Sequence, residues 1–456
     1  MLPPAPLSRL VQDLAEGRTT SRALTEACLD AITDPAGEGA LAFPHGVSVA
    51  ALAEADRQDA LRRSGRPPSP YAGIPISLKD NIDQAGQVTR AGSRLLASEP
   101  AALVDAPVAA RLRVAGLVVI GRTGMTELAF SGLGLNPHYG TPANPRSTEV
   151  RRIPGGSSAG AAISVATGMA AAAVGTDTGG SCRIPAAFCG LVGWKPTAGR
   201  VPRAGVFPLS STLDCVGVLG RTADCCAALD GLMSGQGWRR DHAIVPGRAR
   251  VAALQGYVLD SLDEVVATAY GAALDRLRVA GVEIEEVEVP ALSQVAELNA
   301  QGGLSSLELS RHLGPRLRGR EHEVDPRVAR RIALAAGRPA SEHSRIVAAR
   351  AELMAKVAPA LDRFDAVLCP TTSIVAPRFD ELEQDLDYDR LNLKVLRNPS
   401  IANMLDRCAI TLPCDEPGQL PVGLTLMGRS GGDQDLLSLA CALEPLIRGD
   451  AGARSS

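Results

Sequence analysis

The sequence predicts an α/β protein with a mixed central β-sheet that helices cover on both faces. A helical segment within residues 106–121 leads into an apolar strand at 117–120. The alternation recurs as a strand at 250–254, a helix at 262–279 and a strand at 282–289. Strands that alternate with helices favour a largely parallel or mixed sheet, because each helix returns the chain across one face.

Helical patterns flank the predicted sheet. Residues 8–65 carry apolar side chains at helical spacing and are followed by prolines that end the helical region. Residues 305–360 form a predicted helical arm rich in Arg and Glu, whose charges we expect on a solvated face. With 456 residues, the chain has room for one large domain or for two to three smaller ones.

Composition narrows the class of function. A net charge of −3, a pI near 6.1 and 3% aromatic residues offer no basic field and few stacking surfaces, so we expect no nucleic acid and no membrane as partner. The N-terminus lacks the pattern of a secretory signal. The ten cysteines form no CxxC pair and no histidine belongs to HxH or HExxH, which predicts reduced thiols, a cytoplasmic protein and no metal site.

Two serines, Ser157 and Ser181, each follow a Gly-Gly pair within residues 154–185. The glycines before Ser181 allow successive N–H groups to turn inward and form an anion-binding concavity. Ser157 and Ser158 precede an alanine-rich run, where a serine at or near the N-cap predicts the start of a buried helix. Such a helix start directs N–H donors and partial positive charge at a ligand. The stretch is therefore suited to stabilising an oxyanion.

A lysine supplies the base that these serines need. Residues 73–81 form a predicted apolar strand that places Lys79 in its interior or at its end. Desolvation in such a strand lowers the pKa of an amine, which can then act as a neutral base. In this mechanism Ser181 is the nucleophile, Ser157 passes on its proton and Lys79 accepts it.

A second mechanism rests on the motif at residues 156–160, which matches the GxSxG nucleophile elbow of α/β-hydrolases. That elbow requires a strand directly before the turn, whereas residues 150–154 make a poor strand. It also requires a catalytic histidine, and the histidines after the motif have no distinguishing context. The lysine-based mechanism therefore fits the sequence better.

These motifs resemble the signature of the amidase signature family. The resemblance rests on Gly155-Gly156-Ser157-Ser158, on residues 175–186, on Gly193-Trp194-Lys195-Pro196-Thr197, on residues 73–81, and on the 24 positions between the two serines. It covers nearly the whole chain. It implies the amidase signature fold as a single domain over residues 1–456, with N-terminal helices at about 5–65, a signature core at about 70–230 and a C-terminal αβ part at about 249–450.

The resemblance also implies roles for particular residues. Ser181 resembles the acylated nucleophile, Ser157 the bridging serine held in a cis peptide after Gly156, and Lys79 the general base. The implied oxyanion hole consists of backbone N–H groups, and three further side chains are implied as supports of the site. The oxyanion donors are the N–H groups of Thr178, Gly179, Gly180 and Ser181. The supporting side chains are those of Ser158, Asp177 and Arg183. Cys182 departs from the usual aliphatic residue and predicts sensitivity to thiol reagents.

The substrate class follows from the same resemblance. Residues 126–145 resemble the indoleacetamide and mandelamide hydrolase branch, which implies that Phe130, His138 and Tyr139 line a pocket for a small-molecule arylacetamide. The expected product is a carboxylate, with release of ammonia and no cofactor. Two alternatives remain, a hydrolase of biuret-like or allophanate-like ureides and a glutamine-dependent amidotransferase A subunit that acts on misacylated tRNA. A homodimer is common among relatives and is possible here.

Overall fold

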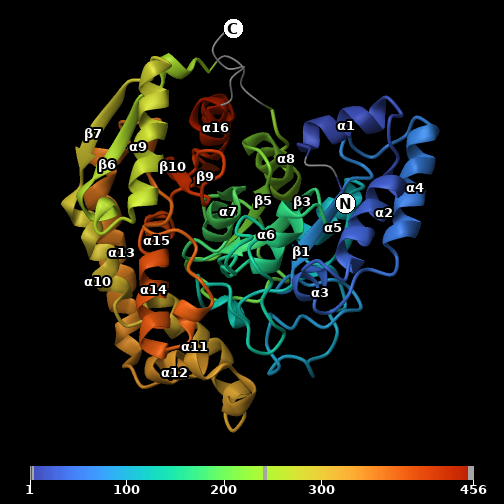
Figure 1. Cartoon of the computed structure of the whole chain (residues 1–456). Helices are drawn as coiled ribbons and strands as arrows, with labels where there is room; N and C mark the ends of the chain where they lie inside the picture. Colours follow the sequence, from blue (N-terminus) through green and yellow to red (C-terminus); the bar gives the residue numbers. More distant parts are fainter. Residues whose placement is uncertain (1, 3–4, 240–243, 450–456) are drawn as a thin grey trace.

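A ten-stranded mixed sheet forms the centre of the computed structural model, which describes residues 2, 5–239 and 244–449 (Figure 1). The strands lie in the order β2-β1-β3-β5-β4-β9-β10-β8-β6-β7. Their bounds are β1 Pro75–Lys79, β2 Val118–Thr123, β3 Ala172–Asp177, β4 Val192–Lys195, β5 Cys215–Gly220, β6 Val251–Gln255, β7 Ile284–Glu288, β8 Ala366–Pro370, β9 Ala409–Pro413 and β10 Gly423–Met427.

Helices surround this sheet along its whole length (Figure 1). The α-helices are α1 Leu7–Ala15, α2 Ser21–Thr33, α3 Gly39–Ala42, α4 Ala51–Arg63, α5 Pro107–Val114, α6 Ala159–Ala166, α7 Arg183–Cys189, α8 Ala223–Ser234, α9 Glu264–Val279, α10 Gln294–Asn299, α11 Gly303–Leu317, α12 Pro326–Ala336, α13 Ala340–Leu361, α14 Asp385–Leu396, α15 Pro399–Met404 and α16 Asp433–Arg448. Short 3-10 helices lie at Glu127–Ala129, Pro246–Arg248, Gly256–Leu259, Pro290–Ser293, Glu321–Glu323 and Asp380–Leu382. In the described part of the chain, no helix is both long and apolar enough to cross a membrane.

The directions of the central strands bring distant segments to one edge of the sheet. β1 pairs in parallel with β2 and with β3, so Lys79 and Asp177 end their strands at the same edge. β5 runs antiparallel to β3, and its first residue, Cys215, pairs with Asp177. The end of β1, the end of β3 and the start of β5 therefore lie together.

Helices cover both faces of the sheet, as the sequence predicts. On one face, Gly175 and Gly217 make room for the residue that precedes α7, because a Cβ at either position would lie within 3.0 Å of the Cys182 thiol. On the opposite face, a Cβ at Gly220 would lie 3.0 Å from Cys225 in α8. The strand–helix–strand unit predicted between residues 250 and 289 is also confirmed, as β6, α9 and the parallel strand β7.

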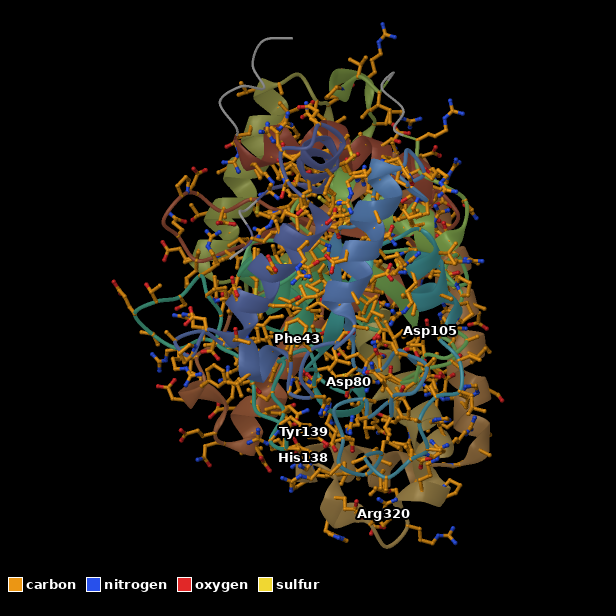
Figure 2. All side chains as sticks on the ribbon, turned by 90° about the vertical axis from the view of Figure 1, so that its right-hand side faces the viewer. Phe43, Asp80, Asp105, His138, Tyr139 and Arg320 are labelled. Atoms are coloured by element: carbon orange, nitrogen blue, oxygen red, sulfur yellow. The ribbon has the colours of Figure 1, made fainter. Side chains whose placement is uncertain are left out.

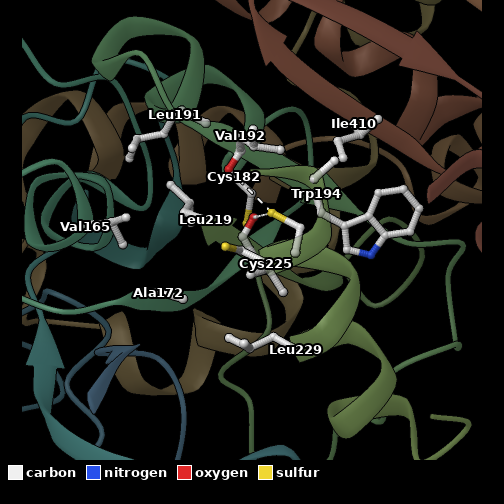
Figure 3. Close-up of a cluster of buried hydrophobic side chains, with 14 of the residues drawn as sticks. Val165, Ala172, Cys182, Leu191, Val192, Trp194, Leu219, Cys225, Leu229 and Ile410 are labelled. Carbon is white, nitrogen blue, oxygen red and sulfur yellow. Dashed lines mark hydrogen bonds between the residues drawn. The ribbon is translucent and has the colours of Figure 1, made fainter. Parts of the chain in front are cut away.

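The largest cluster of buried side chains spans these two layers. Figure 3 shows Trp194 beside Ile410, its partner across β4 and β9, while Leu219 lies apart from them on the other face of the sheet. The indole of Trp194 is completely buried, and its Nε1 donates to Asp230 at 2.9 Å, so the polar atom of this large side chain is satisfied. The cluster gives the site a rigid support.

The predicted serine at the start of the buried helix is confirmed, and one prediction for the helical arm was wrong in detail. Ser158 occupies the N-cap position of α6, but its side chain accepts no capping bond; its hydroxyl instead donates to the Thr176 carbonyl at 3.4 Å. The helical arm is present as α11, α12 and α13, yet not all of its charges are solvated. Glu308 in α11 is only 8% exposed, because it accepts hydrogen bonds from a loop of the sheet layer.

Gly217→Ala should destabilise the sheet. A Cβ at this position would lie 2.2 Å from the Trp194 carbonyl oxygen, which is fixed in the ladder between β4 and β5. We expect the free energy of unfolding to fall by roughly 1–3 kcal/mol, the usual cost of overpacking. Chemical denaturation of the variant and the parent chain measures this difference.

Gly271→Ala is the matched control, since this glycine lies within α9 and a Cβ there would meet nothing within 4 Å. Alanine should stabilise the helix by about 1 kcal/mol. Equal stability of the two variants would contradict the packing described for Gly217.

Candidate active site

The amine of Lys79 and the hydroxyl of Ser157 are in contact inside the protein, at the edge of the sheet where β1 and β3 end. Lys79 is the last residue of β1, and Ser157 lies in the turn before α6, where the Gly156–Ser157 peptide bond is cis. Lys79 Nζ lies 2.8 Å from Ser157 Oγ and 2.9 Å from Thr176 Oγ1. Lys79 and Ser157 are both completely buried. The two residues are thus in direct contact.

The surroundings of Lys79 favour its neutral form. Burial lowers the pKa of the amine to about 8, while the charges of Asp177 and Asp214 raise it. An amine with such a pKa is neutral in about a tenth of the molecules at pH 7. Thr176 Oγ1 also accepts from Asn81 Nδ2 at 3.0 Å, which holds the oxygen in place beside the amine. A base is therefore available without an adjacent carboxylate or histidine.

Ser181 follows the turn at the end of β3 and is 4% exposed, whereas Lys79 and Ser157 are completely buried. The Ser181 carbonyl accepts a hydrogen bond from the Ser158 amide at 3.2 Å, which places its backbone next to the turn that carries Ser157. Among the described residues, no hydrogen bond joins the Ser181 hydroxyl to Ser157 or Lys79. The structure thus puts Lys79 and Ser157 in direct contact and Ser181 beside their turn, and the catalytic roles of the three residues stay a prediction.

Asp177 anchors the loop that carries Ser181. Its carboxylate accepts from the amides of Gly180 at 2.9 Å and Cys182 at 3.1 Å, and it forms a buried ion pair with Arg183 at 3.0 Å. Burial alone would raise the pKa of Asp177, but the charge and hydrogen bonds of Arg183 hold it at about 2. Asn403 donates to the same carboxylate at 3.0 Å. The loop therefore has one fixed conformation on this side.

This anchoring changes the expected set of oxyanion donors. The amide of Gly180 donates to Asp177 Oδ1, and Gly180 itself has a φ of 120°, a conformation suited to glycine. Gly180 N–H is therefore directed at the carboxylate. The amides of Thr178, Gly179 and Ser181 stay as the candidate donors to a substrate oxygen.

Ser158 and Cys182 fill the space between the sheet and residues 178–181, which form the catalytic loop, also called the oxyanion loop. The Ser158 hydroxyl contacts the end of β3, and the Cys182 thiol lies against Gly175 and Gly217. Cys182 is completely buried, and burial raises the pKa of its thiol. The expectation of thiol sensitivity is therefore not supported, since neither access nor a thiolate is available. All ten cysteines are free and buried.

Phe130 lies on the segment that faces the catalytic loop. The segment continues to Gly132, whose carbonyl accepts from the Gly156 amide at 2.8 Å. A Cβ at Gly132 or at Gly179 would meet the same atom, Leu396 Cδ2, at 3.2 and 3.6 Å. Leu396 is therefore an apolar wall beside the oxyanion loop, and Phe130 lies two residues from Gly132 along the chain.

His138 and Tyr139 belong to a neighbouring polar cluster. Figure 2 shows them next to each other on the side of the molecule that carries Asp80. His138 Nε2 lies 3.1 Å from Glu127 Oε1, and the Tyr139 ring packs edge-on against His45 at 4.7 Å. Within the described residues, neither side chain forms a hydrogen bond to Lys79, Ser157 or Ser181. Their place in a substrate pocket stays a prediction.

Three further site residues were not assigned a role from the sequence. Asn81 and Thr176 lie within the motifs at residues 73–81 and 175–186, and their polar side chains next to an apolar strand could have indicated them. Asn403 comes from α15, and no local pattern connects it with Asp177. Among the described residues, no group of three His, Cys, Asp or Glu side chains has a geometry that could hold a metal ion.

A family profile described as Amidase matches residues 23–437. The chain belongs to the amidase family. A 2-amino-5-chloromuconic acid deaminase of Comamonas testosteroni is 36% identical over 394 residues, with 85% of each chain covered. The indoleacetamide hydrolase of Pseudomonas savastanoi is 33% identical over 461 residues, covering 97% of this amidase and 96% of the relative.

Other similar proteins include a component of a larger enzyme. The A subunit of the glutamyl-tRNA(Gln) amidotransferase of Symbiobacterium thermophilum is 34% identical over 436 residues, covering 87% of this amidase and 88% of the relative. A solved amidase structure superposes with a TM-score of 0.86 at 30% identity, covering 96% of this chain and 98% of the other. This agreement supports the amidase signature fold.

Proposed function

We propose that this amidase hydrolyses a small-molecule carboxamide through an acyl-enzyme on Ser181. The observation that carries the proposal is the 2.8 Å contact between Lys79 Nζ and Ser157 Oγ, completely buried and next to the only slightly exposed Ser181. A buried amine with a pKa of about 8 is matched to proton transfer near neutral pH. The reaction converts an amide and water into a carboxylate and ammonia.

In the first half of the reaction, Ser181 Oγ attacks the amide carbon. Its proton passes to Ser157, whose own proton passes to neutral Lys79. The carbonyl oxygen becomes an oxyanion, stabilised by the N–H groups of Thr178, Gly179 and Ser181. When the tetrahedral intermediate collapses, the proton returns through Ser157 to the amide nitrogen, the C–N bond breaks and ammonia leaves.

In the second half, water replaces ammonia as the partner of the acyl group. Lys79, again neutral, takes a proton from the water through Ser157 while the water oxygen attacks the acyl carbon. Collapse of the second tetrahedral intermediate breaks the bond to Ser181 Oγ, which recovers a proton through the same path. The carboxylate product leaves, and no metal or cofactor takes part in this scheme.

An apolar acyl group suits the wall beside the catalytic loop. Leu396 lies against the positions of Gly132 and Gly179. Phe130 is on the same segment as Gly132 but packs in a separate apolar cluster, with the Arg331 guanidinium over its ring. Such a wall supports an arylacetamide as substrate, the class that the name of the indoleacetamide hydrolase also indicates. Ureides share the same chemistry, and an amidotransferase A subunit would require glutamine and partner subunits.

The free, buried thiols are consistent with a reducing compartment such as the cytoplasm.

The rate of hydrolysis should depend on the neutral form of Lys79. Because burial lowers the pKa of Lys79 to about 8, kcat/KM should rise with pH up to that value and level off above it. Below it, kcat/KM should fall about tenfold per pH unit as the amine is protonated. Steady-state kinetics across this range measures the profile, and an optimum near pH 5 would contradict the role of Lys79.

The purified chain alone should release ammonia from an arylacetamide. The assay compares arylacetamides, aliphatic amides, glutamine and biuret, with Ser181→Ala expected to abolish turnover. Ser164→Ala is the matched control, because Ser164 is a buried serine on α6 whose hydroxyl, among the described residues, bonds to Ser77 and to the Ala161 carbonyl. It should leave the rate unchanged.

Other outcomes of this assay have definite meanings. Turnover of biuret alone would assign a ureide hydrolase, and turnover of glutamine alone would favour the amidotransferase alternative. Activity that persists in Ser181→Ala would contradict Ser181 as the nucleophile.

A further inference from the structure

A second carboxylate, Asp214, holds the oxyanion loop from the side opposite Asp177. Asp214 directly precedes β5, whose antiparallel pairing with β3 puts it beside the end of β3. Thr178 Oγ1 donates to Asp214 Oδ1 at 2.6 Å. The amides of Leu209 and Ser210 both donate to Asp214 Oδ2 at 3.0 Å. One carboxylate thus ties Thr178 to the loop before β5.

This loop is in turn held by Glu308 of α11. Glu308 accepts from the Ser210 hydroxyl at 2.5 Å, and from the amide and hydroxyl of Thr212 at 3.1 and 2.5 Å. His343 Nε2 of α13 lies 2.8 Å from Glu308 Oε1. A continuous chain of hydrogen bonds therefore runs from the helical arm to Thr178.

The two carboxylates on the oxyanion loop differ in one respect. Asp177 is paired with Arg183, whereas Asp214 has no ion pair among the described residues. Arg203 donates to the Asp214 carbonyl oxygen at 3.3 Å, so its charge is near but does not contact the carboxylate. Every hydrogen bond to the Asp214 side chain comes from an N–H or O–H donor, which requires acceptor oxygens on the carboxylate.

We infer that Asp214 is a positioning residue whose ionised carboxylate fixes Thr178 in the conformation that stabilises the oxyanion, and that Glu308 keeps Asp214 in place. The inference rests on the proposed function. A proton on Oδ2 of Asp214 would oppose the two amides that donate to it. A proton on Oδ1 would force the Thr178 hydroxyl to reverse its role and accept, which changes the orientation of Thr178. A displacement of about 1 Å in a catalytic group can lower the rate about 100-fold.

The surroundings of Asp214 place its titration in an accessible range. Burial raises the pKa of Asp214 to about 6, while the hydrogen bonds from Thr178, Ser210 and Leu209 and the charge of Arg203 oppose the shift. The negative charge of Asp214 raises the pKa of Lys79. Ser210 lies between Asp214 and Glu308 and bonds to both carboxylates. Activity should therefore depend on two groups with opposite requirements, a neutral Lys79 and an ionised Asp214.

The test compares pH profiles of kcat for the parent chain, Asp214→Asn and a control. In the parent, log kcat should fall with a slope of about 1 between pH 8 and pH 6 and about 2 below pH 6. Asp214→Asn should lower kcat by about 10- to 100-fold at alkaline pH, change KM by less than about twofold, and keep a slope of about 1 below pH 6. A purely structural defect would not change this slope.

Asp59→Asn is the matched control, since Asp59 is a buried aspartate whose carboxylate accepts two backbone amides, from Ser21 and Arg22, far from the site. Its profile should equal that of the parent. Thr178→Val removes the same hydrogen bond without changing the carboxylate. It should reproduce the loss of kcat at unchanged KM, and it carries the test if Asp214→Asn does not fold.

Three results distinguish a failure of the inference on Asp214 from a failure of the proposed function. If Asp214→Asn keeps the slope of the parent below pH 6, or if Thr178→Val has the kcat of the parent, the inference is wrong. If either occurs while Ser181→Ala is inactive, the proposed function stands without it. If Ser181→Ala is active, the proposed function itself fails.

Discussion

The site depends on an amine that the protein keeps out of water. Lys79 is completely buried at the end of β1, and its amine bonds to hydroxyl oxygens and a main-chain carbonyl. In the described part of the chain, no carboxylate forms an ion pair with it. Burial of a charged amine is unfavourable, so a larger fraction of the amine is neutral and can serve as a base. The packed helices α6 and α7 and the closely spaced strands around this residue provide the dry surroundings that it requires.

The topology of the sheet assembles the rest of the site. Parallel strands β1 and β3 end at one edge, and β5 begins there because it runs in the opposite direction. The base, the loop that carries Ser181 and the carboxylate of Asp214 therefore come from three segments that meet at one place. Two carboxylates of different character then fix the loop, one neutralised by Arg183 and one held by hydroxyl and amide donors.

The sequence was sufficient for the parts of the site that depend on local patterns. Glycines next to Ser157 and Ser181, and a lysine in an apolar strand, mark close backbone approach and desolvation wherever they occur, and the helix–strand alternation predicted the mixed sheet. Contacts made by residues outside the motifs could not be predicted. Asn403 and Leu396 reach the loop only through folding, and Glu308 was expected in solvent because a charged helix shows no sign of which charge turns inward.

The most direct test of the account is the identity of the residue that carries the acyl group. The enzyme can be quenched with acid during turnover of its fastest amide substrate, digested and analysed by mass spectrometry. The account predicts an adduct equal to the substrate without ammonia on the peptide that contains Ser181, and no adduct in Ser181→Ala. An adduct on Ser157, on Lys79 or on a cysteine would contradict it.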